Sequence, residues 1–446
     1  MSTPYGVRGD LVVATSPGPP PDPNVEIVTI GDELLLGLTV DTNGAWLARE
    51  LAHLGVSVAR RGSVGDNADD ITSAVGEALA RSGAVITTGG LGPTADDLTK
   101  PAIAAIFGRD LYFDEVQWER LREIWRSRGR AGEPPEANKQ QMMLPRGCTV
   151  LVNRHGSAPG IFLEDADGRW VAMLPGVPRE MRGLWVDELE PLVRRRLPPN
   201  AEPIRSLVVR TTGIAESALP ARLGDAAQGI DGLALAYLPG QEGVDLRLTS
   251  RHRSAAVAEV ALRAGADLLR RRIGSPVYAE GATDLAEVVL ERCRALGRTL
   301  AVAESCTGGL LGARLTAIPG SSDVFLGGLI TYANQAKETL AGVTPEMLEN
   351  VGAVSREVAE AMARAARERL GASIGIGITG IAGPGGGTPA KPVGLVWIAL
   401  VDDGAPLSLG GQMIGDRQEI RFRATQTALD MIRRRLAPAA EEGSPA

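Results

Sequence analysis

Four loops of glycine and other small residues, each directly after a short apolar run, constrain the fold of this chain more than any other feature. Two lie near the N-terminus, at 31–35 and 87–97, and two lie in the last third, at 303–309 and 377–387. Each apolar run is typical of a buried strand. Open α/β sheets bind ligands at the carboxyl ends of their strands, where these loops would lie. The pattern predicts α/β domains with two separate small-molecule sites.

Strand and helix patterns alternate from residue 25 to residue 88. Apolar runs at 25–30, 57–63 and 84–88 are typical of strands, and the segments 42–54 and 69–82 between them are typical of amphipathic helices. Strands that alternate with helices in this way form parallel sheets with right-handed crossovers. The N-terminal part is therefore predicted to be an α/β domain built on a parallel sheet.

The chain of 446 residues is too long for a single hydrophobic core, so we expect three domains. After the parallel-sheet domain, short β-like runs and one long helix predict a small α+β domain. A renewed alternation of helix and strand around the two later loops predicts a third domain of the α/β class. Proline, glycine and serine near the N-terminus are typical of disorder, and the last residues look similar. We predict tails at 1–24 and 437–446, and domains at 25–200, 203–275 and 283–436.

Composition and charge argue against nucleic-acid and membrane partners. The formal net charge is -7, so the chain has no overall excess of positive charge that would attract nucleic acid. Aromatic residues make up 4%, which argues against a surface on which bases stack. No apolar run approaches the roughly 20 residues of a membrane span, and the first residues lack a signal-peptide pattern. Three cysteines without metal-ligand spacing fit a reducing compartment. We expect a cytoplasmic protein that acts on small molecules.

The predicted third domain has a nucleophile but no histidine to activate it. All three histidines of the chain lie before residue 283. Ser305 ends a predicted strand, which places the N–H groups of Cys306 to Gly309 as an oxyanion or phosphate cradle. Only four lysines occur among 47 basic residues, and an ammonium, unlike a guanidinium, can act as a base when its pKa is lowered. A Ser305–Lys337 pair, with Tyr332 relaying or orienting, is the leading hypothesis.

Other interpretations of these residues remain open. Ser305 or Thr307 is also typical of a helix N-cap, and Lys337 of a solvated helix residue. Cys306 is a rival nucleophile with Glu304 as its base, although a small buried residue at a helix start is the commoner role.

A phosphate site and a metal site are predicted together near the N-terminus. Glycines let the backbone approach a phosphate closely, and the start of a helix after the loop favours an anion. Adjacent carboxylates suit a divalent cation, Mg²⁺ or a first-row metal. The alternative is that Asp96 caps a helix that runs to Ala105 and that Asp97 favours its first turn. The predicted phosphate-binding residues are Gly89, Gly90, Gly92 and Thr94, and the predicted metal ligands are Asp32, Glu33, Asp96 and Asp97.

The stretch 283–432 resembles the C-terminal, nicotinamide-nucleotide amidase domain of the competence/damage-inducible CinA family. The shared motifs are Ala303–Gly309, Tyr332–Lys337, Gly352–Ser355, Gly377–Gly386, Lys391–Gly394 and Gly415–Arg417. The resemblance implies hydrolysis of the carboxamide of nicotinamide mononucleotide to nicotinate mononucleotide and ammonia, without a cofactor. Ser305 would be the nucleophile and Lys337 its base partner, with Tyr332 beside them. The implied substrate-binding residues are Thr307, Gly308, Gly309, Thr379, Gly380 and Arg417.

Residues 25 to about 180 resemble the N-terminal domain of the same family, which is similar to the molybdopterin-binding fold. The shared elements are Gly31–Glu33, Asp41–Asn43, Gly89–Thr99, Asn153, Gly156–Gly160, Leu174–Pro178 and Glu180–Met181. The resemblance implies metal-dependent hydrolysis of ADP-ribose to AMP and ribose 5-phosphate. It also implies a homodimer, and a KH-like domain at 203–275 that need not bind RNA.

Three functional hypotheses follow. The first is a bifunctional pyridine-nucleotide salvage enzyme that carries both hydrolytic activities. The second is a nucleotide-sensing adaptor of the competence or DNA damage response, in which one or both sites bind without turnover. The third is an N-terminal domain that binds a pterin. The presence of Ser305, Lys337 and both glycine loops favours the enzyme for the C-terminal domain.

Overall fold

The computed structural model describes residues 24–199 and 201–437. These residues form two compact units, which we describe separately. The first contains the chain up to Arg205 together with Arg251–Ala258, and the second contains Ser206–Ser250 and the chain from Glu259 onward. The predicted tails lie almost wholly outside the described residues. Asn24, which we had assigned to the N-terminal tail, begins the first strand.

The first unit is built on a six-stranded sheet of order β2-β1-β3-β8-β7-β6. The strands β2, β1, β3 and β8 run parallel, as predicted, whereas β7 and β6 are antiparallel to their neighbours. Strand β7 (Gly160–Glu164) is not among the predicted strands. The α/β class and the parallel-rich sheet are confirmed, with an antiparallel edge.

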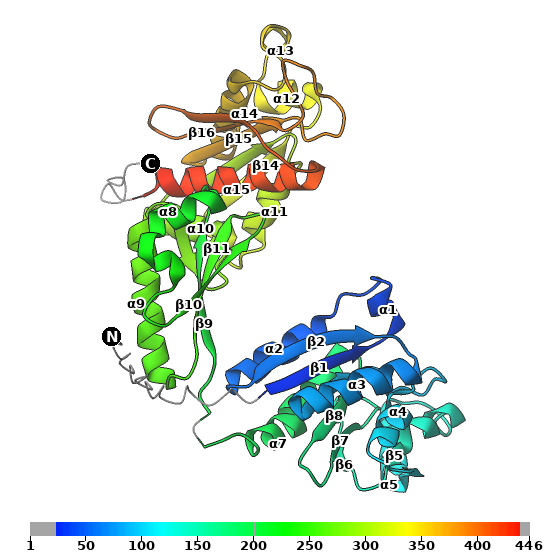
Figure 1. Cartoon of the computed structure of the whole chain (residues 1–446). Coiled ribbons are helices and arrows are strands. Elements are labelled where there is room, and N and C mark those ends of the chain that lie inside the picture. Colours follow the sequence, from blue (N-terminus) through cyan, green and yellow to red (C-terminus); the bar gives the residue numbers. More distant parts are fainter. Residues whose placement is uncertain (1–23, 200, 438–446) are drawn as a thin grey trace, which may run out of the picture. The chain divides into compact units, whose positions relative to one another are not determined.

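Side chains alternate between the two faces of this sheet. Ile27, Ile86 and Ala172 point to the face covered by α2, α6 and the helical turns after it, and Val85 and Val171 point to the face covered by α3 and α4. Helices on both faces bury the central strands β3 and β8 completely, which explains why neither strand alternates apolar with charged residues. In Figure 1 this unit is coloured from blue to green along the chain. Its elements are β1 (Asn24–Ile30), α1 (Asp32–Leu35), α2 (Thr42–His53), β2 (Ser57–Val64), α3 (Ala68–Ser82), β3 (Ala84–Thr88), α4 (Thr99–Ile106), β4 (Leu111–Phe113), α5 (Glu115–Ser127), η1 (Glu136–Met142), β5 (Met143–Pro145), β6 (Thr149–Leu151), β7, β8 (Trp170–Leu174), α6 (Pro178–Leu184), η2 (Trp185–Leu189) and α7 (Glu190–Arg194).

The second unit begins with a small four-stranded sheet of order β10-β11-β9-β12, in which β10 pairs with β11 and β12 with β9 antiparallel. The long helix α9 and the short helix α8 pack on it through a common apolar core. This is the predicted small α+β domain. Its elements are β9 (Arg205–Thr211), η3 (Glu216–Ala218), α8 (Leu219–Leu223), η4 (Gly224–Gln228), β10 (Ala234–Pro239), β11 (Val244–Ser250), α9 (Ala255–Ile273) and β12 (Val277–Glu280).

The rest of the second unit is a five-stranded mixed sheet of order β14-β13-β15-β16-β17 between two layers of helices. Strands β14, β13 and β15 are parallel, and β16 and β17 are antiparallel additions. Helices α10, α11 and α15 pack on one face and α14 on the other. Glycines bring α14 unusually close to β15: a Cβ on Gly375 or Gly377 would lie 2.0 or 2.1 Å from a carbonyl oxygen of α14.

Figure 1 shows α15 running past both the small sheet and the larger one within this unit. None of the helices in the described ranges is long and apolar enough to cross a membrane. The remaining elements are α10 (Leu285–Ala295), β13 (Leu300–Glu304), α11 (Leu310–Thr316), η5 (Ser321–Asp323), β14 (Phe325–Ile330), α12 (Asn334–Ala341), α13 (Pro345–Asn350), α14 (Arg356–Leu370), β15 (Ile374–Gly380), β16 (Leu395–Val401), β17 (Leu407–Gln412) and α15 (Arg417–Arg435).

Candidate functional sites

The first unit has a cavity of about 450 Å³ at the carboxyl ends of its parallel strands. The loop after β3 forms one wall, and the loops after β1 and β8 form others. Its acidic lining comes from four different segments, namely Glu33, Asp66, Asp96 with Asp97, and Glu180. Among the described residues, no lysine or arginine belongs to this lining. The cavity is therefore strongly anionic and lies where α/β sheets bind ligands.

The glycine loop after β3 has no room for side chains. Gly89 has φ +112°, and a Cβ there would lie 2.0 Å from the carbonyl oxygen of Ile30. Gly90 has φ +64°, and its Cβ would lie 2.1 Å from Oγ1 of Thr99. Glycine is required at both positions by backbone conformation and by close approach, as the sequence predicted for a loop that cradles a ligand.

Asp97 folds this loop rather than starting a helix. Its carboxylate accepts hydrogen bonds from the N–H of Gly92 at 2.6 Å, from the N–H of Thr94 at 2.8 Å and from the hydroxyl of Thr94 at 2.5 Å. Helix α4 begins only at Thr99, and its N-cap residue makes no side-chain cap. The interpretation of Asp96 as a helix cap is therefore wrong, and so is a helix start near Asp96. Asp97 was proposed as a metal ligand, but its oxygens already accept three donors.

Four carboxylates from the segments after β1, β2 and β3 influence one another in or beside this cavity. Asp32 and Asp66 exchange hydrogen bonds, from the Asp32 N–H at 3.0 Å and from the Asp66 N–H at 3.1 Å. Burial raises the pKa of Asp66, and the negative charges of Asp32, Glu33 and Asp96 raise it further, although the Asp32 N–H opposes them. Within the described ranges, no three His, Cys, Asp or Glu residues are arranged to hold a metal ion by themselves.

These acidic groups nevertheless fit a hard divalent cation. Mg²⁺ prefers oxygen ligands and is commonly held by one or two carboxylates, with waters and substrate phosphates completing its coordination. Burial, and after it the repulsion of neighbouring carboxylates, raises the pKa of Asp66, and a bound cation would offset both effects by favouring the ionised carboxylate. The residues that face the cavity and could hold it are Glu33, Asp66 and Asp96.

Some cavity residues were not predicted from the sequence. Asp66 follows β2, whose carboxyl end lies beside that of β1, so the strand pattern could have indicated it. The Glu180 carboxylate accepts a 2.6 Å hydrogen bond from Asn153 and holds the loop at 153–158 over the cavity. Behind the cavity, Lys100 is 2% exposed, and burial lowers its pKa to about 8, opposed by the charge of Asp97.

In the second unit, Ser305 lies at the carboxyl end of β13, next to the end of β15. Its N–H donates to the carbonyl of Ile378 at 2.9 Å, and its side chain is nearly buried. Gly380 ends β15, and a Cβ there would lie 3.1 Å from Sγ of Cys306. The two small-residue loops predicted from the sequence therefore meet at one place.

The loop after Ser305 is anchored by a carboxylate from the strand. Glu304 is 1% exposed, and its oxygens accept hydrogen bonds from the N–H groups of Gly309, Leu311 and Gly312 at 3.1, 3.1 and 2.8 Å. Helix α11 begins at Leu310, so neither Ser305 nor Thr307 is its N-cap and the predicted helix start is wrong. Glu304 is occupied as the acceptor of this helix terminus, which argues against a role as the base for Cys306.

The N–H groups of the loop divide into two sets. That of Gly308 donates to the carbonyl of Ser305, and that of Gly309 donates to Glu304. Those of Cys306 and Thr307 donate to no oxygen of a described residue. They lie against the Cys306 thiol instead, whose pKa their hydrogen bonds lower in part. Of the predicted cradle at 306–309, these two N–H groups directly follow Ser305 and have no oxygen acceptor among the described residues.

Lys337, in the first turns of α12, is a buried amine without a carboxylate partner among the described residues. It is 2% exposed, and its Nζ donates to the carbonyls of Thr331 and Tyr332 at 3.0 and 3.2 Å. Burial lowers its pKa, opposed by the nearby Cys306. Burial also raises the pKa of Cys306 to about 11, so its thiol stays protonated near pH 7. The solvated interpretation of Lys337 is wrong, and Cys306 is unsuited to act as a thiolate.

Arginines from α15 hold the loops around these residues. Arg417 donates to the carbonyl of Gly383 at 2.6 Å and to the hydroxyl of Tyr332, which is 60% exposed, at 3.0 Å. Arg421, which the sequence analysis did not single out, donates to the carbonyl of Thr307 at 2.7 Å. The hydroxyl of Thr379 donates to the carbonyl of Ala353. The predicted substrate residues thus surround one strand-end site.

The fold and these sites define a class of protein in which a molybdopterin-binding-like domain, a KH-like domain and a C-terminal α/β domain follow one another. Sequence profiles match in that order: the probable molybdopterin binding domain at 26–195, the damage-inducible protein CinA KH domain at 206–279 and the CinA C-terminal domain at 282–436.

The chain belongs to the CinA family. It is 58% identical over 414 residues to a CinA-like protein of Gemmatimonas aurantiaca, covering 93% of this chain and 96% of that one. It is 44% identical over 417 residues to a CinA-like protein of Desulfovibrio desulfuricans, covering 92% and 96%. Among solved structures, the competence/damage inducible protein CihA from Agrobacterium tumefaciens is 44% identical, with a TM-score of 0.32 over 33% of this chain and 90% of that one.

Proposed function

We propose that the C-terminal domain hydrolyses the carboxamide of nicotinamide mononucleotide, releasing ammonia and nicotinate mononucleotide. The observation that supports this proposal is the buried Lys337: burial lowers its pKa, and it interacts electrostatically with Cys306, the neighbour of Ser305. A lysine whose pKa is lowered is the kind of base that a Ser–Lys hydrolase uses.

In the proposed mechanism, Ser305 Oγ attacks the carboxamide carbon and Lys337 takes the hydroxyl proton. The N–H groups of Cys306 and Thr307 stabilise the oxyanion that forms. Lys337 then gives the proton to the leaving nitrogen, so that ammonia departs and an acyl ester remains on Ser305. Water attacks this ester, Lys337 again accepts the proton, and nicotinate mononucleotide leaves as Ser305 regains its hydrogen. The guanidinium of Arg417, beside Tyr332, supplies positive charge for the substrate phosphate.

We also propose that the N-terminal cavity hydrolyses ADP-ribose to AMP and ribose 5-phosphate. The rigid glycine loop lets backbone approach the diphosphate, and Glu33, Asp66 and Asp96 would hold a divalent cation. When bound, that cation would neutralise the charge of the diphosphate and its leaving group. The role of Asp97 is to fix the loop geometry through Gly92 and Thr94.

One experiment tests both activities in the full-length protein. Ammonia and nicotinate mononucleotide are measured after incubation with nicotinamide mononucleotide without metal, and AMP is measured after incubation with ADP-ribose and Mg²⁺. Ser305→Ala should abolish ammonia release and leave AMP formation intact, and Asp66→Asn should do the reverse. Turnover by Ser305→Ala at the wild-type rate would refute the nucleophile. A folded wild type without either turnover would favour a nucleotide-sensing adaptor.

A further inference from the structure

The cavity of the first unit contains a buried amide, that of Gln141, to which the proposed hydrolysis assigns no role. The charged residues of the lining are all acidic. Apart from these carboxyl groups, Gln141 and Ser157 are the side chains that carry an N–H or O–H donor among the described residues of the lining. Gln141 is 3% exposed. Because an unpaired polar group in a buried place is costly, the partners of this amide indicate what the cavity binds.

The carbonyl end of the Gln141 amide is fixed, whereas its amino end is not. Residues three apart lie on one face of the 3₁₀ helix η1, and there Nδ2 of Asn138 donates to Oε1 of Gln141 at 2.9 Å. Nε2 of Gln141 donates to no oxygen of a described residue, yet it is not among the unpaired atoms that are closed off from solvent. Since Gln141 lines the cavity, this accessible nitrogen offers its N–H groups there.

Two consecutive residues of α4 hold this amide beside the glycine loop. The hydroxyl of Thr99 donates to the carbonyl of Gly89 at 3.0 Å, and Nζ of Lys100 donates to the carbonyl of Gln140 at 2.5 Å. Both Thr99 and Lys100 are buried. The start of α4 thus fixes the glycine loop with one residue and the segment before Gln141 with the next. This places Gln141 at the glycine-loop end of the cavity.

The glycine loop supplies further donors at this end. The N–H groups of Gly90 and Leu91, which both line the cavity, make no hydrogen bond with a described residue. Together with the Gln141 amide they form a set of neutral donors. A phosphate presents several acceptor oxygens and no obligatory donor, so it suits this set better than a nucleobase, which presents donors and acceptors together. A cation on the carboxylates would supply the positive charge that these donors lack.

We propose that Gln141 is a substrate-binding residue of this cavity, which donates from Nε2 to an oxygen of the diphosphate at the glycine loop. The proposal rests on the proposed hydrolysis only for the identity of the substrate, ADP-ribose, because the contact itself requires a nucleoside diphosphate bound with a divalent cation. Lys100 and Asn138 are positioning residues, since they hold the carbonyl before Gln141 and its Oε1.

The test compares Gln141→Met with Gln141→Glu in the full-length protein. The first change removes donor and acceptor together, whereas the second keeps an acceptor oxygen for Asn138 and removes only the donor. Binding is measured with ADP and Mg²⁺, as the ADP concentration that half-protects peptides covering 87–97 from hydrogen–deuterium exchange. Both variants should raise this concentration at least about tenfold, because a hydrogen bond to a charged group is lost. Gln117→Glu, the same change in the first turn of α5 and outside the cavity lining, is the matched control and should bind as the wild type does.

Three results would overturn the proposal. Wild-type affinity of Gln141→Glu would show that Gln141 only supports Asn138, and this variant decides alone if Gln141→Met does not fold. Wild-type affinity of a folded Gln141→Met would exclude the contact. Unprotected 87–97 peptides in the wild type at millimolar ADP with Mg²⁺ would exclude the diphosphate.

Formation of AMP from ADP-ribose, measured on the same proteins, separates this proposal from the proposed hydrolysis. A wild type that binds ADP through Gln141 but forms no AMP would refute the hydrolysis and support the contact. A wild type that forms AMP, with both Gln141 variants binding ADP as tightly, would refute the contact alone.

Discussion

Glu304 is expected to be the main stabiliser of the loop that carries Ser305. Its buried carboxylate accepts three backbone hydrogen bonds from the start of α11, and a hydrogen bond to a charged group contributes about 1.5–3 kcal/mol. The lower end of that range gives about 4.5 kcal/mol for the three hydrogen bonds. Release of the carboxylate from burial offsets part of this loss. We expect Glu304→Ala to cost about 3 kcal/mol locally, and Glu304→Gln, which keeps one acceptor oxygen, to cost about half as much.

Local amide exchange in the full-length protein measures this effect, because the loop opens as its own unit. A loss of about 3 kcal/mol corresponds to exchange roughly 100-fold faster in peptides covering 300–316. Ammonia release should fall in parallel, since the N–H donors after Ser305 lose their position. Glu338→Ala, on the exposed face of α12, is the matched control and should leave exchange unchanged. Unchanged exchange in Glu304→Ala would refute the assigned role of this carboxylate.

Three further predictions follow from other charged groups. Lys337→Arg should abolish ammonia release, because a guanidinium does not act as a base. The wild-type rate should rise with pH through a pKa below 10.5, because burial lowers the Lys337 pKa and only the neutral amine accepts a proton. A pH-independent rate would contradict this role. Asp402→Asn should lower the stability of the second unit by about 1–2 kcal/mol at pH 7, since the hydrogen bond from the partly exposed Arg435 lowers the Asp402 pKa to about 2. That stability is present above pH 3.8 and is lost as the pH falls through about 2, so calorimetry should show the two proteins converging in acid. Asp97→Ala should abolish AMP formation from ADP-ribose, because Gly92 and Thr94 lose the carboxylate that fixes their loop, and ammonia release should persist. Retained AMP formation would count against the role of Asp97 in holding this loop.

The fold was largely predictable because local pattern and burial agree. Central strands such as β3 and β15, covered on both faces, are buried almost without interruption, and glycine loops mark their carboxyl ends. The predicted helix starts were wrong where a carboxylate outside the helix forms hydrogen bonds with the backbone near the helix start. Helix α11 starts at Leu310 instead of Ser305 because Glu304 satisfies its first N–H groups from the preceding strand. Helix α4 starts late because Asp97 bonds backward to its own loop.

The sites were predictable only in part, for a related reason. Glu33, Asp96 and Lys337 lie next to recognisable loops, so the sequence indicated them. Asp66 follows β2, beside β1, and the parallel strand pattern could have indicated it. Glu180 lies in the first turn of α6, after β8, and reaches the cavity only because β8 lies beside β3 in the sheet, which the local pattern does not encode. The metal, the homodimer and the cytoplasmic location stay predictions.

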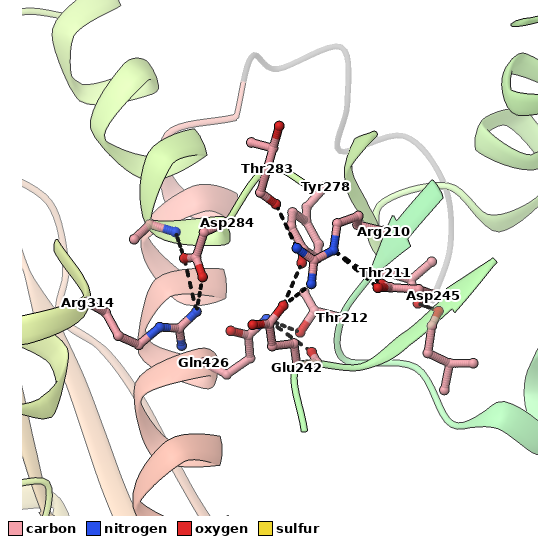
Figure 2. Close-up of polar contacts among 12 residues, drawn as sticks. Arg210, Thr211, Thr212, Glu242, Asp245, Tyr278, Thr283, Asp284, Arg314 and Gln426 are labelled. Atoms are coloured by element: carbon pink, nitrogen blue, oxygen red, sulfur yellow. Dashed lines mark hydrogen bonds and ion pairs between the residues drawn. The ribbon is translucent and has the colours of Figure 1, made fainter. Parts of the chain in front are cut away.

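Helix α15 connects features of the second unit that the sequence left separate. Its first turns hold the site loops, through Arg417 to Gly383 and through Arg421 to Thr307. Two turns later, Gln426 holds the loops of the small α+β domain, and Arg433 near its end donates to the carbonyl of Ser275. These contacts, of which those of Gln426 are drawn in Figure 2, make α15 the element that ties the loops around Ser305 to the loops of the small α+β domain.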